Sequence, residues 1–504
     1  MFYHTLIITI GAFFSKLLGL MRDVSIAWLL GSTTTADALT IALRLPFFFR
    51  RLLGEGSLSI GLTSICRHES ICSNSGIQLT LRIAVIFALI IGTISSVVWF
   101  IPTIALDILA PGFNWEHTVH SETIQLFRIC LPYIIFAILT SGCIAVLHSE
   151  RHFLLPALSP VLFNSSVIIF ALISIGYTPI DRGVFLSYGV LCGGIFQWMS
   201  QLPLALYLKK AEPKVDYNIS ILTKNVLKIP KNIFIASIPQ LTFILATALT
   251  SFLPTGHVAS LFYAERLIEF PIGILSSAIG IVALPVLTTI YRQNKLSIFG
   301  DEVSKNVSLI LAINFPAALG LIAISMPLVQ AIFYHGEFNF QAVNITTFAL
   351  CAYAPGLPAI ALSKTLLSTY YAINNQTVPF YVGMLTITLS FLLGALLLYF
   401  FNIIGPPLAA SLSLWFYCWL LWKKLHCFIP VHFPFKKVSL QLLAACCTFI
   451  LCYTTVYFLS DGVPVITICL VVPIGIISYV ASLYLLDKKQ LIQIIKNIRY
   501  PTSI

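Results

Sequence analysis

Apolar residues run along this chain in stretches long enough to cross a lipid bilayer, separated by short segments that hold most of the charge. A membrane-spanning helix needs about 20 such residues. Because no polar segment long enough for a soluble domain lies between these runs, we expect an all-α integral membrane protein. The pattern predicts fourteen transmembrane helices, at residues 5–30, 35–64, 80–108, 122–148, 154–176, 184–208, 232–252, 259–290, 306–330, 342–372, 379–399, 406–422, 438–459 and 464–486.

The charges between these runs predict the orientation of the chain. Nineteen Lys and Arg residues lie in one set of alternating loops and tails, and one, Arg182, lies in the opposite set. Since cytoplasmic loops are enriched in Lys and Arg, we expect both termini in the cytoplasm. The same bias accounts for the net charge of +11, so the charge implies no nucleic-acid partner.

Composition and motifs exclude several function classes. Of the 504 residues, 58% are hydrophobic and only 9% are charged, whereas soluble proteins carry about 25% charged residues. The sequence contains no Walker-type phosphate-binding loop and no Cys or His spacing typical of a metal site. We therefore expect a membrane protein that is not an enzyme, holds no metal or cofactor and is not driven directly by ATP.

Eight charged residues lie between positions 16 and 55, in a stretch that otherwise has the composition of membrane helices. A charge at the bilayer centre costs about 2.5–3.5 kcal/mol, so such charges face water or each other and often mark a substrate path. Five of the eight are cationic, and arginine binds phosphate through two parallel hydrogen bonds. The cluster predicts a hydrated cavity for a phosphorylated substrate and consists of Lys16, Arg22, Asp23, Asp37, Arg44, Arg50, Arg51 and Glu55.

A weak internal repeat suggests how the helices are organised. The segment 42–45 (ALRL) resembles 264–267 (AERL) at an offset of 222 residues, and in the second copy Glu265 and Glu269 flank Arg266. Repeated halves that meet at a central site are common in transporters. The repeat predicts two six-helix lobes around a central cationic cavity, at 1–231 and 232–437, followed by two further helices and a cytoplasmic tail at 438–504.

Packing explanations remain open for several of these residues. The charges can pair with one another, or lie at helix ends and extend to the interface. Asn164, which follows Pro160 within a predicted span, can bind a substrate or make an interhelical hydrogen bond. Lys364 is equally open between a functional and a packing role.

Five stretches resemble the MurJ/MviN family, the lipid II flippases of bacterial peptidoglycan synthesis. They are 15–23 (SKLLGLMRD), 36–38 (ADA), 45–56 (LPFFFRRLLGEG), 110–113 (APGF) and 263–271 (YAERLIEFP). The resemblance implies two six-helix lobes of the multidrug and oligosaccharidyl-lipid exporter type, and a lipid-tail groove formed by two C-terminal helices. It also implies alternating access that moves lipid II from the cytoplasmic to the outer leaflet of the inner membrane.

The resemblance also assigns residues. It implies that Arg22, Arg50 and Arg266 hold the pyrophosphate, and that Asp37 and Glu55 pair with arginines. The family often has arginine at the position of Lys16, and its sodium site is not carried over because helix 232–252 has no Asp or Glu. The remaining candidates are Lys16, Arg51 and Asn164 for substrate binding, and Asp23, Glu265 and Glu269 for charge pairing and gating.

Other functions stay open at this point. One is a multidrug/cation antiporter, which we would expect to rely on isolated carboxylates; another is an O-antigen or polysaccharide lipid flippase. A membrane scaffold without transport would have no reason to keep buried charges in its central helices. For a flippase, the expected driving force is the membrane potential, and the expected partners are lipid II, membrane lipids and, as a candidate, the cell-wall synthesis machinery.

The predicted topology can be tested by cysteine labelling on a cysteine-free background. Because of the loop charges, cysteines at positions 114 and 335 should react with an impermeant reagent from outside the cell. Cysteines at 214 and 426 should react only after the membrane is permeabilised. Labelling of position 214 from outside would contradict the fourteen-helix topology.

Overall fold

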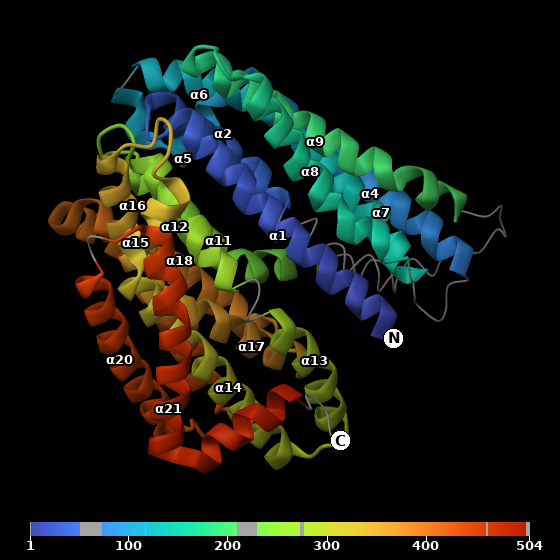
Figure 1. Cartoon of the computed structure of the whole chain (residues 1–504). Helices are drawn as coiled ribbons and strands as arrows, with labels where there is room; N and C mark the ends of the chain where they lie inside the picture. The colour runs from blue at the N-terminus through green and yellow to red at the C-terminus, as the bar shows by residue number, and fades with distance from the viewer. Residues whose placement is uncertain are drawn as a thin grey trace. The chain divides into compact units, whose positions relative to one another are not determined.

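The computed structural model describes residues 2–50, 73–115, 117–150, 152–208, 229–272, 277–459 and 462–499. Within these ranges every assigned element is a helix, and no strand occurs (Figure 1). Ten helical stretches of the described residues are long and apolar enough to cross a membrane. The all-α membrane class is therefore confirmed, whereas the count of fourteen spans and the central cationic cavity stay predictions.

The described chain divides into two compact units, and the first consists of Met1–Gln240, Thr247–Ala259 and His335–Asn339. Two short segments that follow Gln240 in the sequence thus pack with the first 240 residues. The helices of this unit are α1 (Phe2–Leu30), α2 (Thr34–Phe49), α4 (Ser73–Phe100), α5 (Pro102–Leu109), η2 (Pro111–Trp115), α6 (His117–Cys130), α7 (Tyr133–Ser149), α8 (Leu154–Ile173), α9 (Pro179–Tyr207) and most of α11 (Ile229–Thr250).

The second unit consists of Leu241–Ala246, Ser260–Tyr334 and Phe340–Ile504. It contains α12 (His257–Pro271) except for its first three residues, α13 (Ser277–Arg292), α14 (Leu296–Ala323), α15 (Ser325–Phe333), α16 (Phe340–Tyr353), η4 (Ala354–Gly356), α17 (Leu357–Ala372), α18 (Thr377–Phe401), η5 (Asn402–Ile404), α19 (Gly405–Leu425), α20 (Phe435–Phe458) and α21 (Pro464–Arg499).

Prolines divide several helices that the apolar pattern predicts as continuous. The predicted span 122–148 is two helices, α6 and α7, with Pro132 at the break, and the span 342–372 is interrupted by η4 around Pro355. Proline lacks a backbone N–H and clashes with the preceding turn. Pro46, in contrast, lies inside α2; residues 51–64 of that predicted helix lie outside the described residues.

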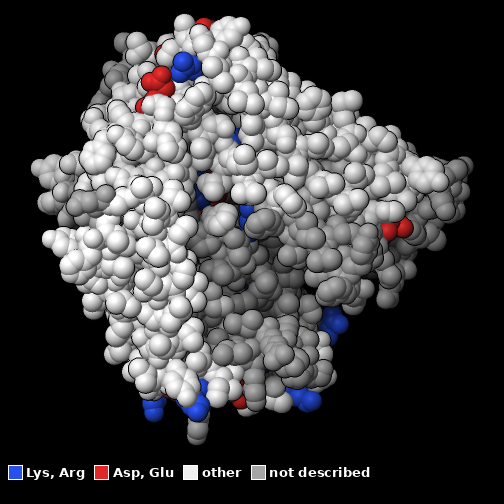
Figure 2. All heavy atoms as spheres, viewed as in Figure 1, with Lys and Arg blue, Asp and Glu red and all other residues white. Residues whose placement is uncertain are grey.

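The surface of the helices has the composition expected for contact with lipid. Large apolar side chains such as Phe100, Leu392 and Phe400 are exposed, and exposed apolar patches of this extent mark membrane contact. Figure 2 shows that most of the visible described surface carries no Lys, Arg, Asp or Glu side chain.

Two glycines allow α9 to approach α8 closely within the first unit. A Cβ at Gly193 would lie 2.9 Å from Cδ2 of Phe163, and one at Gly189 would lie 3.1 Å from the Cα of Val167. Small residues at such spacing let membrane helices pack backbone to backbone. α8 also lies beside α1 (Figure 1). The close packing of α9 on α8 therefore helps to set the position of α8 relative to α1.

In the second unit, the two C-terminal helices are held to α14 by side-chain hydrogen bonds. Gln441 of α20 donates from Nε2 to Oγ of Ser308 at 3.0 Å, and the hydroxyl of Tyr479 on α21 donates to the carbonyl of Ala312 at 2.6 Å. Hydrogen bonds of this kind help membrane helices to associate, because lipid provides no hydrophobic driving force between them.

Asp37, at the start of α2, holds the N-terminus of α12 inside the first unit. Its Oδ2 accepts the backbone N–H of Gly256 at 2.6 Å, and its Oδ1 accepts that of Ala259 at 2.7 Å. The first N–H groups of a helix have no partner within the helix, and a carboxylate there is favoured by the helix dipole. Ala259 is also the residue that the sequence repeat aligns with Asp37. The acid predicted to pair with arginines therefore also serves as a capping group between helices.

Removing this cap should lower stability. For Asp37→Ala we expect a loss of about 0.5–2 kcal/mol, as for other helix caps, and a smaller loss for Asp37→Asn, which keeps one acceptor. Thermal unfolding in detergent measures both variants against Asp301→Ala, whose carboxylate is exposed on α14. Equal melting temperatures for Asp37→Ala and Asp301→Ala would show that the cap contributes nothing.

Candidate functional site

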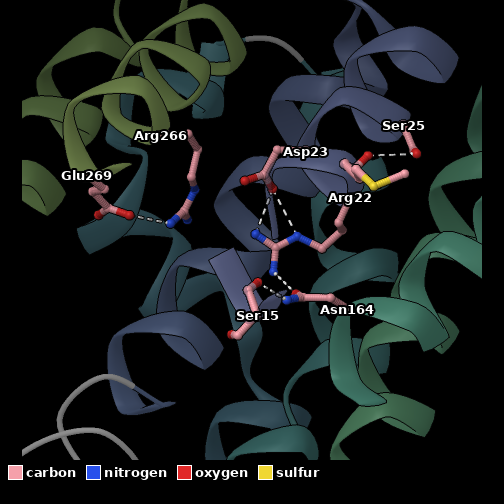
Figure 3. Close-up of polar contacts among 8 residues, drawn as sticks. Ser15, Arg22, Asp23, Ser25, Asn164, Arg266 and Glu269 are labelled. Atoms are coloured by element: carbon pink, nitrogen blue, oxygen red, sulfur yellow. Dashed lines mark hydrogen bonds and ion pairs between the residues drawn. The ribbon is translucent and has the colours of Figure 1, made fainter. Parts of the chain in front are cut away.

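Arg22, on α1, is buried and hydrogen-bonded through all three of its guanidinium nitrogens. Nε and Nη2 donate to Oδ1 of Asp23 at 2.9 and 2.7 Å, and Nη1 donates to Oδ1 of Asn164 at 3.0 Å (Figure 3). Arg22 and Asp23 are each only 3% exposed. A buried charge is tolerated only when it is paired and its donors are satisfied. The predicted pairing partner Asp23 and the predicted polar residue Asn164 together meet this requirement.

Asn164 connects two helices that are far apart in the sequence. Its Nδ2 donates to the carbonyl of Ser15 on α1 at 3.0 Å, while its Oδ1 accepts from Arg22. Of the two roles left open by the sequence, the interhelical hydrogen bond is thus present in the structure. A direct contact between Asn164 and a substrate stays a prediction.

Arg22 and Arg50 lie against the same two aromatic rings. The guanidinium carbon of Arg22 is 5.1 Å from the ring centroid of Phe47 and 5.8 Å from that of Phe163; the distances for Arg50 are 5.1 and 4.9 Å. Cation–π attraction acts within about 6 Å. Two residues predicted to bind substrate are therefore gathered at one place in the first unit.

Sequence reasoning missed both aromatic residues of this group. Phe47 stands three residues before Arg50 in the run Leu-Pro-Phe-Phe-Phe-Arg, and Phe163 directly precedes Asn164. Both neighbours were candidates, so proximity in the sequence was a signal. In a chain that is 13% aromatic, however, this signal does not single out these two rings from the others.

Arg266 forms a separate group within the second unit. Its Nη1 is 2.7 Å from Oε2 of Glu269, one turn further along α12 (Figure 3). Its guanidinium carbon is 4.4 Å from the ring centroid of Phe262. Glu265, next to Arg266 in the sequence, is buried. The predicted pairing of Arg266 with a flanking acid is thus observed for Glu269.

The remaining candidates are placed less fully. Lys16 is partly buried on α1, whereas Arg51 and Glu55 lie outside the described residues. Arg44 is buried in α2. Among the described residues, no group of three or more His, Cys, Asp or Glu side chains could hold a metal ion.

This arrangement suits an anion. Asp23 neutralises Arg22, but Arg50 has a buried Nε that donates no hydrogen bond to any described residue. A buried donor without a partner is costly, and a phosphate oxygen is the type of acceptor that a guanidinium binds best. The group is therefore both ordered and able to accept a further negatively charged partner.

Solved structures of transporters share this fold. A structure of a lipid II flippase MurJ in an inward closed conformation superposes with a TM-score of 0.79 at 24% sequence identity, covering 96% of this chain and 99% of that one. An inward-facing multidrug resistance MATE family transporter of the MOP superfamily superposes with a TM-score of 0.65 at 13% identity, covering 81% and 94%.

Sequence comparisons identify the family. A protein from Vibrio cholerae named probable lipid II flippase MurJ is 28% identical over 512 residues, which cover 95% of each chain. A relative of the same name from Rickettsia prowazekii is 29% identical over 468 residues, covering 89% of this chain and 88% of its own. The family model described as lipid II flippase MurJ matches residues 26–472, and the chain belongs to this family.

Proposed function

We propose that this protein flips lipid II from the cytoplasmic to the outer leaflet of the bacterial inner membrane for cell-wall synthesis. The observation that carries the proposal is the placement of Arg22 and Arg50 on one ring pair in a chain of the flippase family. The lobes 1–231 and 232–437 would alternate access to a central cationic cavity, with fourteen spans and both termini in the cytoplasm.

The two arginines of the first unit have different roles in this proposal. Arg22 is fixed by Asp23 and Asn164, so it supplies a positive charge at a set position. Arg50 has a donor available and binds a phosphate oxygen directly. Arg266 is the third cation that we assign to the pyrophosphate, and Glu269 holds its guanidinium while no substrate is bound.

The other residues assigned from the sequence complete the proposal. Lys16, Arg51 and Asn164 contribute to the substrate site, and Asp23, Asp37, Glu55, Glu265 and Glu269 to pairing and gating. The polyprenyl tail stays in lipid and lies along the C-terminal helices α20 and α21. No metal or organic cofactor takes part.

The rival functions differ in the charge that they need. A cation antiporter needs carboxylates that are accessible to its substrate, but Asp23 accepts from Arg22 and Asp37 accepts from two backbone amides. The likeness to MATE transporters concerns the fold alone. An O-antigen lipid flippase would also bind a diphosphate, and growth tests separate it from a lipid II flippase.

The arginine assignment can be tested in bacteria depleted of their own lipid II flippase. Arg50→Ala and Arg266→Ala should abolish growth complementation while the protein still inserts in the membrane. Arg→Lys at either position should restore it only in part, because lysine keeps the charge but loses the two-pronged hydrogen bonding. Arg292→Ala, at an exposed arginine of α13, is the matched control and should complement fully. Full complementation by Arg266→Ala at normal expression would contradict the assignment.

The membrane potential is the driving force that we propose. A bacterial membrane is negative inside, so outward movement of an anion is downhill by about 2.3 kcal/mol per charge per 100 mV. With roughly two charges moved, the gain is on the order of 4–5 kcal/mol at 100 mV. In proteoliposomes, collapse of the potential should slow flipping, and removal of the sodium gradient alone should not. The reverse pattern, with full flipping at zero potential and none without sodium, would falsify this account.

A further inference from the structure

Phe47 and Phe163 form one aromatic pair across two helices. Their ring centroids are 6.1 Å apart at an interplanar angle of 74°, an edge-to-face geometry that aromatic rings prefer. Phe47 comes from α2 and Phe163 from α8, and Phe163 is fully buried. The pair thus joins α2, which Arg50 directly follows, to the helix that carries Asn164.

This pair brings two like charges close together. Each guanidinium carbon, that of Arg22 and that of Arg50, lies 5.1 Å from the centroid of Phe47, so the two are separated by no more than twice that distance. Two cations within this distance repel each other in a medium of low dielectric constant, and Asp23, which is paired with Arg22, offsets part of that repulsion. The negative ring faces attract both of them and so offset part of this repulsion before any anion is bound.

Phe163 also packs against α7 and α9. The ring of Tyr133 packs against it with centroids 5.3 Å apart, and a Cβ at Gly193 of α9 would come within 2.9 Å of its Cδ2. The ring is therefore enclosed by neighbours from α7 and α9 and is fully buried. The next residue, Asn164, hydrogen-bonds Arg22, so two consecutive residues of α8 fix the position of that guanidinium.

We propose that Phe163 is a positioning residue, which together with Phe47 presets Arg22 and Arg50 as a two-pronged clamp for a diphosphate. Two guanidiniums at a fixed separation favour a ligand with two adjacent phosphate groups over a ligand with one. The clamp therefore selects diphosphate-linked lipids against monophosphate lipids. This inference rests on the proposed function in that it takes the anion bound at these arginines to be the head group of the substrate.

Fluorinated phenylalanines test the role of the ring without a large change in its size. Fluorine withdraws electron density from the ring face, so one, two and three fluorines weaken a cation–π contact stepwise. The analogues are placed at position 163 of the full-length protein, and in parallel at Phe127, a fully buried phenylalanine of α6. Calorimetry then measures the Kd of the purified protein for inorganic pyrophosphate and for inorganic phosphate.

We expect the Kd for pyrophosphate to rise stepwise with fluorination at position 163, and to stay constant with fluorination at position 127. Phe163→Leu should raise it about tenfold, equivalent to about 1.4 kcal/mol, a size in keeping with the loss of two cation–π contacts. The preference for pyrophosphate over phosphate should shrink in the same series. A role in packing alone would not follow the number of fluorines.

Arg50→Ala and Arg22→Ala in the same assay separate this inference from the function on which it rests. If neither variant weakens pyrophosphate binding, the arginines do not bind the substrate and the proposed site itself fails. If both weaken it, while fluorination at 163 has no more effect than at 127, the site stands and the positioning role of Phe163 is overturned.

Discussion

A guanidinium inside a membrane protein must have partners, and the structure around Arg22 depends on this constraint. Asp23 and Asn164 take up its three donor nitrogens, and the aromatic pair lies against it. These partners come from α1, α2 and α8, and Asn164 stands 142 residues after Arg22 in the sequence, so the position of α8 beside α1 is set together with the charge. The close packing of α9 on α8 at Gly193 places α9 directly against Phe163.

The same constraint divides the arginines by what they can do. Arg22 and Arg266 each have a carboxylate partner, which balances their charge without a ligand. Arg50 lies on the rings with an Nε that donates no hydrogen bond to any described residue. We therefore propose that an incoming phosphate binds at Arg50, next to the charge of Arg22.

The sequence predicted the class of fold and named several polar residues that the structure brings together. Charged and strongly polar side chains are unfavourable in lipid, so Arg22, Asp23 and Asn164 stand out from their apolar surroundings in the sequence. The structure brings these three residues together. Helix boundaries were predicted less well, because the apolar pattern continues through Pro132 and Pro355 where the backbone breaks.

The partners that lie far away in the sequence were beyond prediction. Asp37 meets the N-terminus of α12, and Phe163 meets two arginines, only because of the way the helices pack. Neither contact can be recognised from the local sequence. An acid within a span predicts a charge partner as readily as a helix cap. One phenylalanine among 37 is not distinguished from the others.

The most direct test of the central claim is the amount of lipid II accessible at the outer face of the membrane. It is measured in cells depleted of their own lipid II flippase that express this chain. The account predicts that accessible lipid II returns to the level of undepleted cells. No increase over cells with an empty vector, with the protein present in the membrane at normal levels, would contradict it.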